Sequence, residues 1–98
     1  MIHLYERGKL IGAIQQFEFH KGQKEVIDLP TFGGLHYVQG RREPDEVTFQ
    51  LPFFHDNAGI HELVDEDGNV MEITFVNISS SNNTTFIKAY VHSIRKAL

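Results

Sequence analysis

Six histidines are the residues of this sequence that could most readily build a metal site. They are His3, His20, His36, His55, His61 and His92. Zinc sites place their ligands at short, regular spacings and commonly include cysteine. Here His55 and His61 lie six residues apart, and the chain contains no cysteine. The sequence therefore predicts histidines scattered over the surface and the strand edges, and no metal site.

A short acidic segment, Asp65-x-Asp67-x-Asn69, begins like a calcium-binding loop. An EF-hand loop requires glycine at its sixth position and a bidentate glutamate at its twelfth. Those positions hold Val70 and Val76, so the match fails. The segment is instead typical of the acidic end of a helix followed by a hairpin turn.

The motifs of nucleophilic catalysis and phosphate binding are missing from the sequence. The serines at 79–81 lie in a polar turn without a Gly-x-Ser-x-Gly elbow, and no Gly-Lys-Ser/Thr follows Gly33-Gly34 to complete a P-loop. An enzyme would need a sequence-distant pair, such as His55 with Glu62, in a deep pocket. We therefore expect a protein that is not an enzyme and that uses no cofactor.

The composition is that of a single globular domain spanning residues 1–98. Hydrophobic residues make up 41% of the chain and charged residues 22%, which excludes wholesale disorder. The formal net charge of −4 disfavours direct affinity for the phosphates of DNA or RNA. No apolar segment approaches membrane-spanning length, and the first residues lack the apolar run of a secretory signal.

The elements that must position these residues are mostly strands, because apolar and polar residues alternate along much of the chain. Strands are expected over residues 2–4, 10–20, 25–29, 47–53, 70–78 and 84–94, with a turn at 79–83. One short helix is also expected, with Asp56 or Asn57 as its N-cap. Its apolar residues, which have helical spacing, are Ile60, Leu63 and Val64. About six strands and one flanking helix predict an antiparallel β-sandwich or split barrel.

Residues 31–40 carry apolar side chains where a loop would normally be polar. Exposed apolar clusters usually mark contact sites, so this segment could contact another subunit. It could equally fold back as a lid over the core of its own subunit. The first interpretation predicts subunit contacts at Phe32, Leu35, His36, Tyr37 and Val38.

The order and character of the elements over residues 11–53 resemble the tail-tube-like proteins of long-tailed bacteriophages and related contractile particles. Four parts of the sequence, covering about half of the chain, carry the resemblance. They are the strand Ile11–Phe17, the polar hairpin turn after it, the loop Gly33–Arg41 and the Thr-containing apolar run Val47–Phe53.

This resemblance implies a β-sandwich or split barrel with one flanking helix, six copies closing a ring, and rings stacking into a tube. It also implies that residues 31–38 reach a neighbouring subunit or ring. Six copies would carry a formal charge of −24, so DNA would pass through the lumen without specific binding. The chain is short for a main tube subunit, and a tube-like baseplate or tail-end adaptor fits equally well.

We therefore expect a structural subunit of a phage tail, located in the virion and assembled in the host cytoplasm. Its partners would be further copies of itself and other tail or baseplate proteins, without a membrane. A second hypothesis is a small monomeric module that holds a peptide or a carbohydrate on one face of its sheet. A measurement of particle size separates the two.

Overall fold

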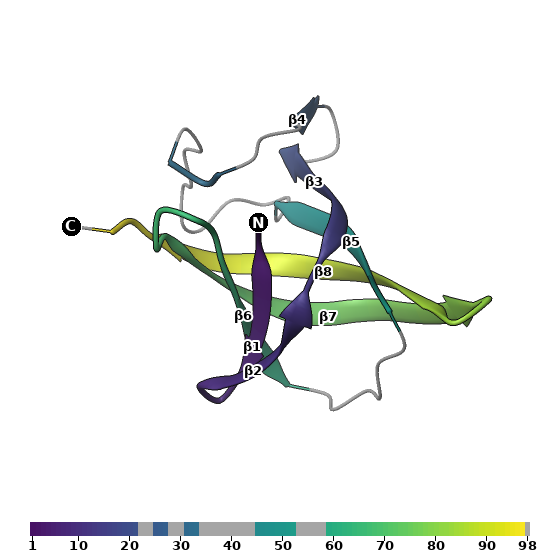
Figure 1. Ribbon diagram of the computed structural model, residues 1–98. Coiled ribbons are helices and arrows are strands. Elements are labelled where there is room, and N and C mark those ends of the chain that lie inside the picture. Colours follow the sequence, from purple (N-terminus) through teal and green to yellow (C-terminus); the bar gives the residue numbers. More distant parts are fainter. Residues whose placement is uncertain (22–24, 28–30, 34–44, 53–58, 98) are drawn as a thin grey trace.

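The computed structural model describes residues 1–21, 25–27, 31–33, 45–52 and 59–97. The regular elements in these ranges are all strands: β1 (His3–Glu6), β2 (Lys9–Ala13), β3 (Gln15–Lys21), β4 (Glu25–Ile27), β5 (Glu46–Pro52), β6 (Ile60–Val64), β7 (Val70–Ser81) and β8 (Thr84–Arg95). They form a single antiparallel sheet in the order β2-β1-β6-β7-β8-β5-β3-β4 (Figure 1). The predicted mainly antiparallel β class is confirmed. Over the described ranges, no helix has the length and apolar character needed to cross a membrane.

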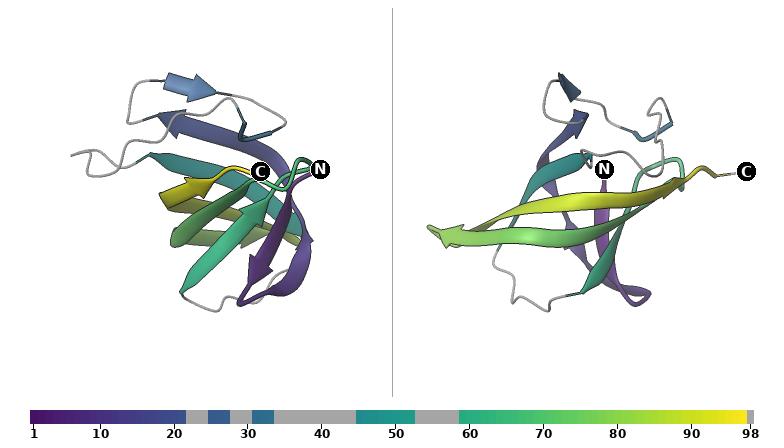
Figure 2. Two further views of the ribbon diagram at one scale, coloured as in Figure 1. Left: turned by 90° about the vertical axis from the view of Figure 1, so that its left-hand side faces the viewer. Right: turned by 180° about the vertical axis from the view of Figure 1, so that it is seen from behind.

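The predicted strand over residues 10–20 is present, but Ile14 divides it into β2 and β3. The backbone N–H of Ile14 donates to the carbonyl oxygen of Ile2 at 2.9 Å. β2 pairs with β1 at one end of the sheet order, whereas β3 pairs with β5 and β4 at the other end. One continuous segment therefore joins both ends of the order, and the sheet curls around its core (Figure 2).

A β-bulge in β3 decides which residues face the core. Gln16 has a φ of 54°, and the pairing of β3 with β5 shifts between Gln15 and Glu18. Ile14 and Phe17 are both buried, while the two glutamines between them are exposed. This three-residue step breaks the period of two. It explains why Ile14, which alternation alone assigns to the face opposite Phe17, shares the core with it.

The predicted helix is wrong for the residues of it that the structure describes. Ile60–Val64 is β6, which lies between β1 and β7. His61 is only 1% exposed, whereas Ile60 is 56% exposed. A polar residue thus takes a core position and an apolar residue faces outward, which made the apolar spacing look helical. The two candidate N-caps, Asp56 and Asn57, lie outside the described residues.

The longest strands are β7 and β8, with 12 residues each. They confirm the predicted strands at 70–78 and 84–94, and β7 continues to Ser81. The turn between them is therefore narrower than predicted and consists of Asn82 and Asn83, whose φ values are 52° and 63°. Asparagine tolerates this left-handed region better than most residues, and two such residues in a row suit a tight hairpin. The closed end of the hairpin points away from the rest of the sheet (Figure 1).

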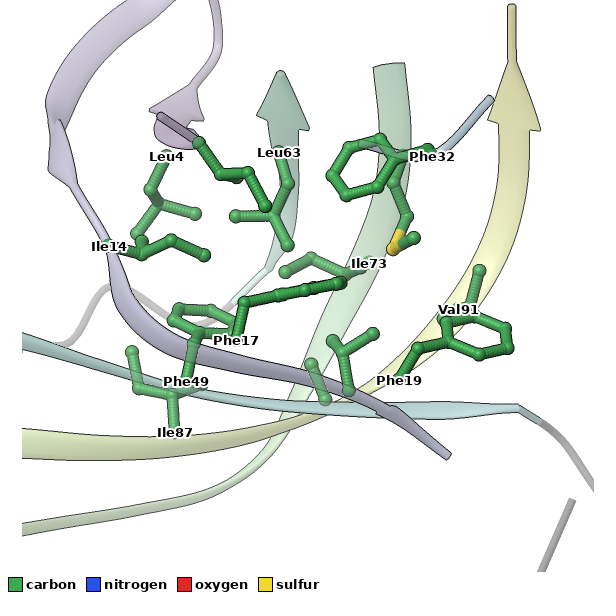
Figure 3. Packing of buried hydrophobic residues seen from close by; sticks show 14 of the residues in the cluster. Leu4, Ile14, Phe17, Phe19, Phe32, Phe49, Leu63, Ile73, Ile87 and Val91 are labelled. Atoms are coloured by element: carbon green, nitrogen blue, oxygen red, sulfur yellow. The ribbon is translucent and has the colours of Figure 1, made fainter. Parts of the chain in front are cut away.

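The core fills the inner side of the curled sheet (Figure 3). Its buried apolar members are Ile2, Leu4, Ile14, Phe17, Phe19, Phe32, Val47, Phe49, Leu51, Leu63, Met71, Ile73, Ile87, Ala89 and Val91. The predicted strand at 47–53 is confirmed as β5, which turns every second residue inward. Pro52 is the last residue of β5 and pairs with Thr84 of β8, past the end of the pairing between β5 and β3. Its missing N–H therefore disturbs no ladder in the middle of the sheet.

Candidate functional site

The outer face of β3, β5, β8 and β7 carries mostly polar side chains, arranged in cross-strand rows. In strand order the rows are Gln15, Gln50, Phe86, Ser79; then Glu18, Thr48, Lys88, Asn77; then His20, Glu46, Tyr90, Thr74. The residues between these positions on β5 and β8 are buried, so the rows project from the opposite side of the sheet. Directly opposite residues have Cβ atoms about 4.5–5.5 Å apart. The rows therefore form one continuous surface.

A hollow of about 330 Å³ lies on this face, over the first two rows. It is lined by Gln16, Glu18, Thr48, Phe49, Gln50, Asn77, Ser79, Phe86, Ile87 and Lys88. Phe49 and Ile87 are core residues, each 2% exposed, that lie between the wall residues along β5 and β8. The side chains of the walls are three amides, two hydroxyls, one carboxylate, one ammonium and one aromatic ring. The hollow is thus rich in groups that form hydrogen bonds.

Two contacts between the rows hold side chains of the hollow in place. Lys88 Nζ lies 3.3 Å from Glu46 Oε2, and His20 Nε2 lies 3.3 Å from Thr48 Oγ1. The ion pair is substantially exposed and contributes little to stability. The ion pair matters instead for the net charge of the hollow, because the carboxylate of Glu46 neutralises the ammonium group of Lys88. The hollow therefore lacks the concentrated positive charge that would recognise a phosphate.

A second polar cluster surrounds Asp65, in the turn between β6 and β7. Its carboxylate accepts hydrogen bonds from the backbone N–H of Phe32 at 2.7 Å, of Asn69 at 2.8 Å and of Asp67 at 3.0 Å. The side-chain amide of Asn69 donates a fourth at 2.9 Å. That amide's oxygen in turn accepts from the backbone N–H of Ala97 at 2.8 Å. Asp65 therefore ties residues 31–33 and the segment after β8 to one turn.

The surroundings of Asp65 also change its acidity. Burial alone would raise the pKa of the carboxyl group, because it disfavours the charged form. The hydrogen bonds from Phe32, Asn69 and Asp67 oppose this effect and together outweigh it. The net pKa lies below the ordinary value of 3.8. A carboxylate held in this way is a structural anchor, since its contacts are with the protein itself.

His61 is a buried residue, so the prediction that the histidines lie on the surface and strand edges is wrong for it. Its ring stacks on that of Phe75, with 4.0 Å between the ring centroids. Nδ1 donates to the carbonyl oxygen of Gly59 at 3.1 Å, and Nε2 lies 3.4 Å from Glu6 Oε2. Within the described ranges, no group of three or more His, Cys, Asp or Glu side chains could hold a metal ion. His36 and His55 lie outside those ranges.

The predicted subunit-contact residues separate into two groups. Phe32 has no exposed surface and packs on Phe17, with 5.5 Å between the ring centroids. This burial within its own chain favours the lid alternative for Phe32, and its contact with a second subunit stays a prediction. The other four residues, Leu35, His36, Tyr37 and Val38, lie outside the described residues.

The second sequence-based hypothesis placed a ligand on one face of the sheet, but it identified neither this outer face nor its hollow. The signal for it was present, since Thr48 and Gln50 alternate with the apolar residues that mark β5 as a strand. What alternation could not supply is the strand order that brings β3, β5, β8 and β7 side by side. Comparison with protein-family models, with curated proteins and with solved structures gives no match to this chain.

Proposed function

We propose that this protein is a structural, non-enzymatic subunit of a bacteriophage tail. Copies of it would join into rings, six to a ring, and the rings would stack into a tube through which DNA passes. A tube-like baseplate or tail-end adaptor is the alternative role for the same mode of assembly. The proposal starts from the resemblance of residues 11–53 to tail-tube-like proteins, and features of the fold support it.

The curl of the sheet is the first supporting feature. β2 and β3 are continuous through Ile14, yet they pair near opposite ends of the strand order. We interpret this arrangement as a split barrel, which is one of the two folds that the resemblance implies. The helix that the resemblance also implies has no counterpart over residues 60–64, which form β6.

The observation that carries the proposal is an open strand edge that bears an exposed apolar side chain. β2 lies at one end of the sheet order, and among the described strands it pairs only with β1. Leu10 of β2 is 52% exposed. It pairs with Tyr5 of β1, and Tyr5 pairs on its other side with Glu62 of β6. Ile60, two residues before Glu62 on the same face of β6, is 56% exposed. An open edge offers backbone groups to another chain, and apolar surface beside it favours burial in a contact.

Replacing Leu10 by lysine is expected to abolish assembly while leaving the subunit folded. The side chain is already exposed, so the substitution removes nothing from the core. A charge on an edge strand opposes pairing with another strand. Light scattering coupled to size-exclusion chromatography should show the wild-type protein as a ring-sized particle and the Leu10→Lys variant as a monomer. Circular dichroism should give the same β spectrum for both.

Val76→Lys is the matched control for this experiment. Val76 is also an exposed apolar residue, at 45%, but it lies at a bulge in β7 rather than on the open edge. This variant should assemble as the wild-type protein does. A wild-type protein that stays monomeric at high concentration would contradict the proposed function.

The predicted contact segment requires its own test. Leu35→Asp combined with Tyr37→Asp is expected to abolish assembly and to leave the folding of the monomer largely intact, because a buried contact does not accept two unpaired charges. Scattering measures the particle size, and the urea midpoint measures stability. If the double variant instead unfolds the monomer, the segment is a lid over its own core.

A further inference from the structure

The backbone at Gln16 is unusual for a residue with a side chain. Its φ of 54° lies in the left-handed region, which costs free energy for any residue with a Cβ atom. Such conformations persist where the surroundings enforce them, and they gather at binding sites. The bulge at Gln16 changes the direction of the strand's side chains, and Gln16 lines the hollow on the outer face. The irregularity of β3 therefore contributes a wall to this hollow.

The lining of the hollow matches a ligand that both donates and accepts hydrogen bonds. Gln16, Gln50 and Asn77 each present an amide with two donor hydrogens and an acceptor oxygen. Hydroxyl groups, which also donate and accept, line the same space at Thr48 and Ser79. A ligand with many hydroxyl groups satisfies such a mixture, whereas a ligand with only acceptors or only donors does not.

The charges at the hollow argue for a neutral ligand. Lys88 is 3.3 Å from Glu46, so its ammonium group is already balanced. Glu18 brings a carboxylate to the β3 side, which repels an anion and accepts hydrogen bonds from hydroxyl groups. For an anionic ligand, the repulsion by Glu18 would therefore outweigh the attraction to the already balanced Lys88.

Phe86 supplies the apolar part of the site. Its side chain is 40% exposed, and in the sheet register it lies between Gln50 and Ser79. An exposed aromatic ring beside amides fits a ligand with a face of C–H groups and a rim of hydroxyl groups, which is the surface of a pyranose sugar. The volume of about 330 Å³ lies at the lower end of the range of roughly 300–1,000 Å³ for ligand sites.

From this chemistry we infer that the hollow on β3, β5, β8 and β7 binds a short stretch of a neutral carbohydrate chain. Because the hollow lies on the face of a sheet and not in an enclosed cavity, a chain can continue beyond it on either side. The inference goes beyond the proposed role as a tail subunit and does not depend on ring formation.

The test is isothermal titration calorimetry with three neutral probes, namely cellohexaose, maltohexaose and hexa-N-acetylchitohexaose. At least one of them should bind with a saturable signal. Phe86→Ala should weaken that binding roughly tenfold, the loss expected for one stacking ring. Gln16→Gly should weaken it roughly fivefold, because it removes a hydrogen-bonding side chain while glycine keeps the left-handed backbone.

Tyr90→Ala is the matched control, since Tyr90 lies on the same strand and the same outer face and is 38% exposed, but does not line the hollow. It should leave the affinity unchanged. The inference is overturned if none of the three probes binds, or if Tyr90→Ala weakens binding as much as Phe86→Ala does. It is also overturned if a sulfated oligosaccharide binds more tightly than its neutral counterpart. Light scattering on the same samples reports assembly separately, so a failure to bind is distinguished from a failure to form rings.

Discussion

Replacing Asp65 by alanine is expected to lower the free energy of unfolding by about 3 kcal/mol or more, because it leaves several buried donors without an acceptor. The buried donors are the backbone N–H groups of Phe32 and Asn69 and the side-chain amide of Asn69, which lie 2.7–2.9 Å from the carboxylate oxygens. The N–H of Asp67, at 3.0 Å, is only partly buried. Asp65 is only 5% exposed, so water cannot readily replace the lost acceptor. Urea unfolding at neutral pH, followed by circular dichroism, measures the loss.

The same anchor gives stability a defined dependence on pH. The pKa of Asp65 is lowered in the folded protein, so its carboxylate contributes stability that is fully present above the ordinary pKa of 3.8. That contribution is lost as the pH falls through the folded pKa. The stability difference between the wild-type protein and Asp65→Asn should therefore be full at neutral pH and should shrink in strong acid.

Asp67→Asn is the control for this pH dependence. Asp67 belongs to the same turn, but its side chain is exposed. This variant should follow the wild-type pH profile closely. A difference between the wild-type protein and Asp65→Asn that stays constant from neutral pH into strong acid would show that the carboxylate charge is not what anchors the turn.

Replacing Phe32 by alanine is expected to lower the free energy of unfolding of the monomer by roughly 3–5 kcal/mol, which is the usual range for removing a fully buried phenylalanine side chain. The ring has no exposed surface and packs on Phe17 at a centroid distance of 5.5 Å. Urea unfolding again provides the measurement. Phe86→Ala is the matched control, since Phe86 is 40% exposed and its loss should cost far less.

The outcome of this substitution also decides, for Phe32, between the two interpretations of the apolar segment at residues 31–40. A Phe32→Ala protein that keeps its stability but no longer assembles would show that Phe32 contacts a neighbouring subunit instead of covering its own core. Because the N–H of Phe32 donates to Asp65, the effects of Phe32→Ala and Asp65→Ala are expected to be non-additive. The double variant measures how strongly the ring and the anchor depend on each other.

The strands were predictable where one face is buried and the alternation is unbroken. β5 is such a case, because Val47, Phe49 and Leu51 alternate with polar residues and all three are buried. The prediction failed at β6, where His61 takes a core position that is filled by stacking on Phe75. A buried polar residue is stable there only because of partners from elsewhere in the fold, and a local pattern does not contain them.

The candidate site was harder to predict than the strands. The hollow depends on the bulge at Gln16 and on strand order, and neither follows from local alternation. The anchor at Asp65 joins residues that are more than thirty positions apart in the sequence, such as Phe32 and Asp65. The sequence did indicate the acidic end of a helix over residues 65–69 with a hairpin turn at Asp67-Gly68, but it could not show that the carboxylate of Asp65 holds other segments in place.

The division of one strand at Ile14 has a consequence for how the molecule unfolds. Because β2 and β3 are joined by continuous backbone and pair near opposite ends of the strand order, we expect neither end of the sheet to unfold independently of the other. Denaturation should therefore be a single cooperative transition, with fluorescence and circular dichroism giving coincident curves. Many of the pairings also join distant parts of the chain, as β3 with β5 and β1 with β6, so refolding should be slow for a polypeptide of this size.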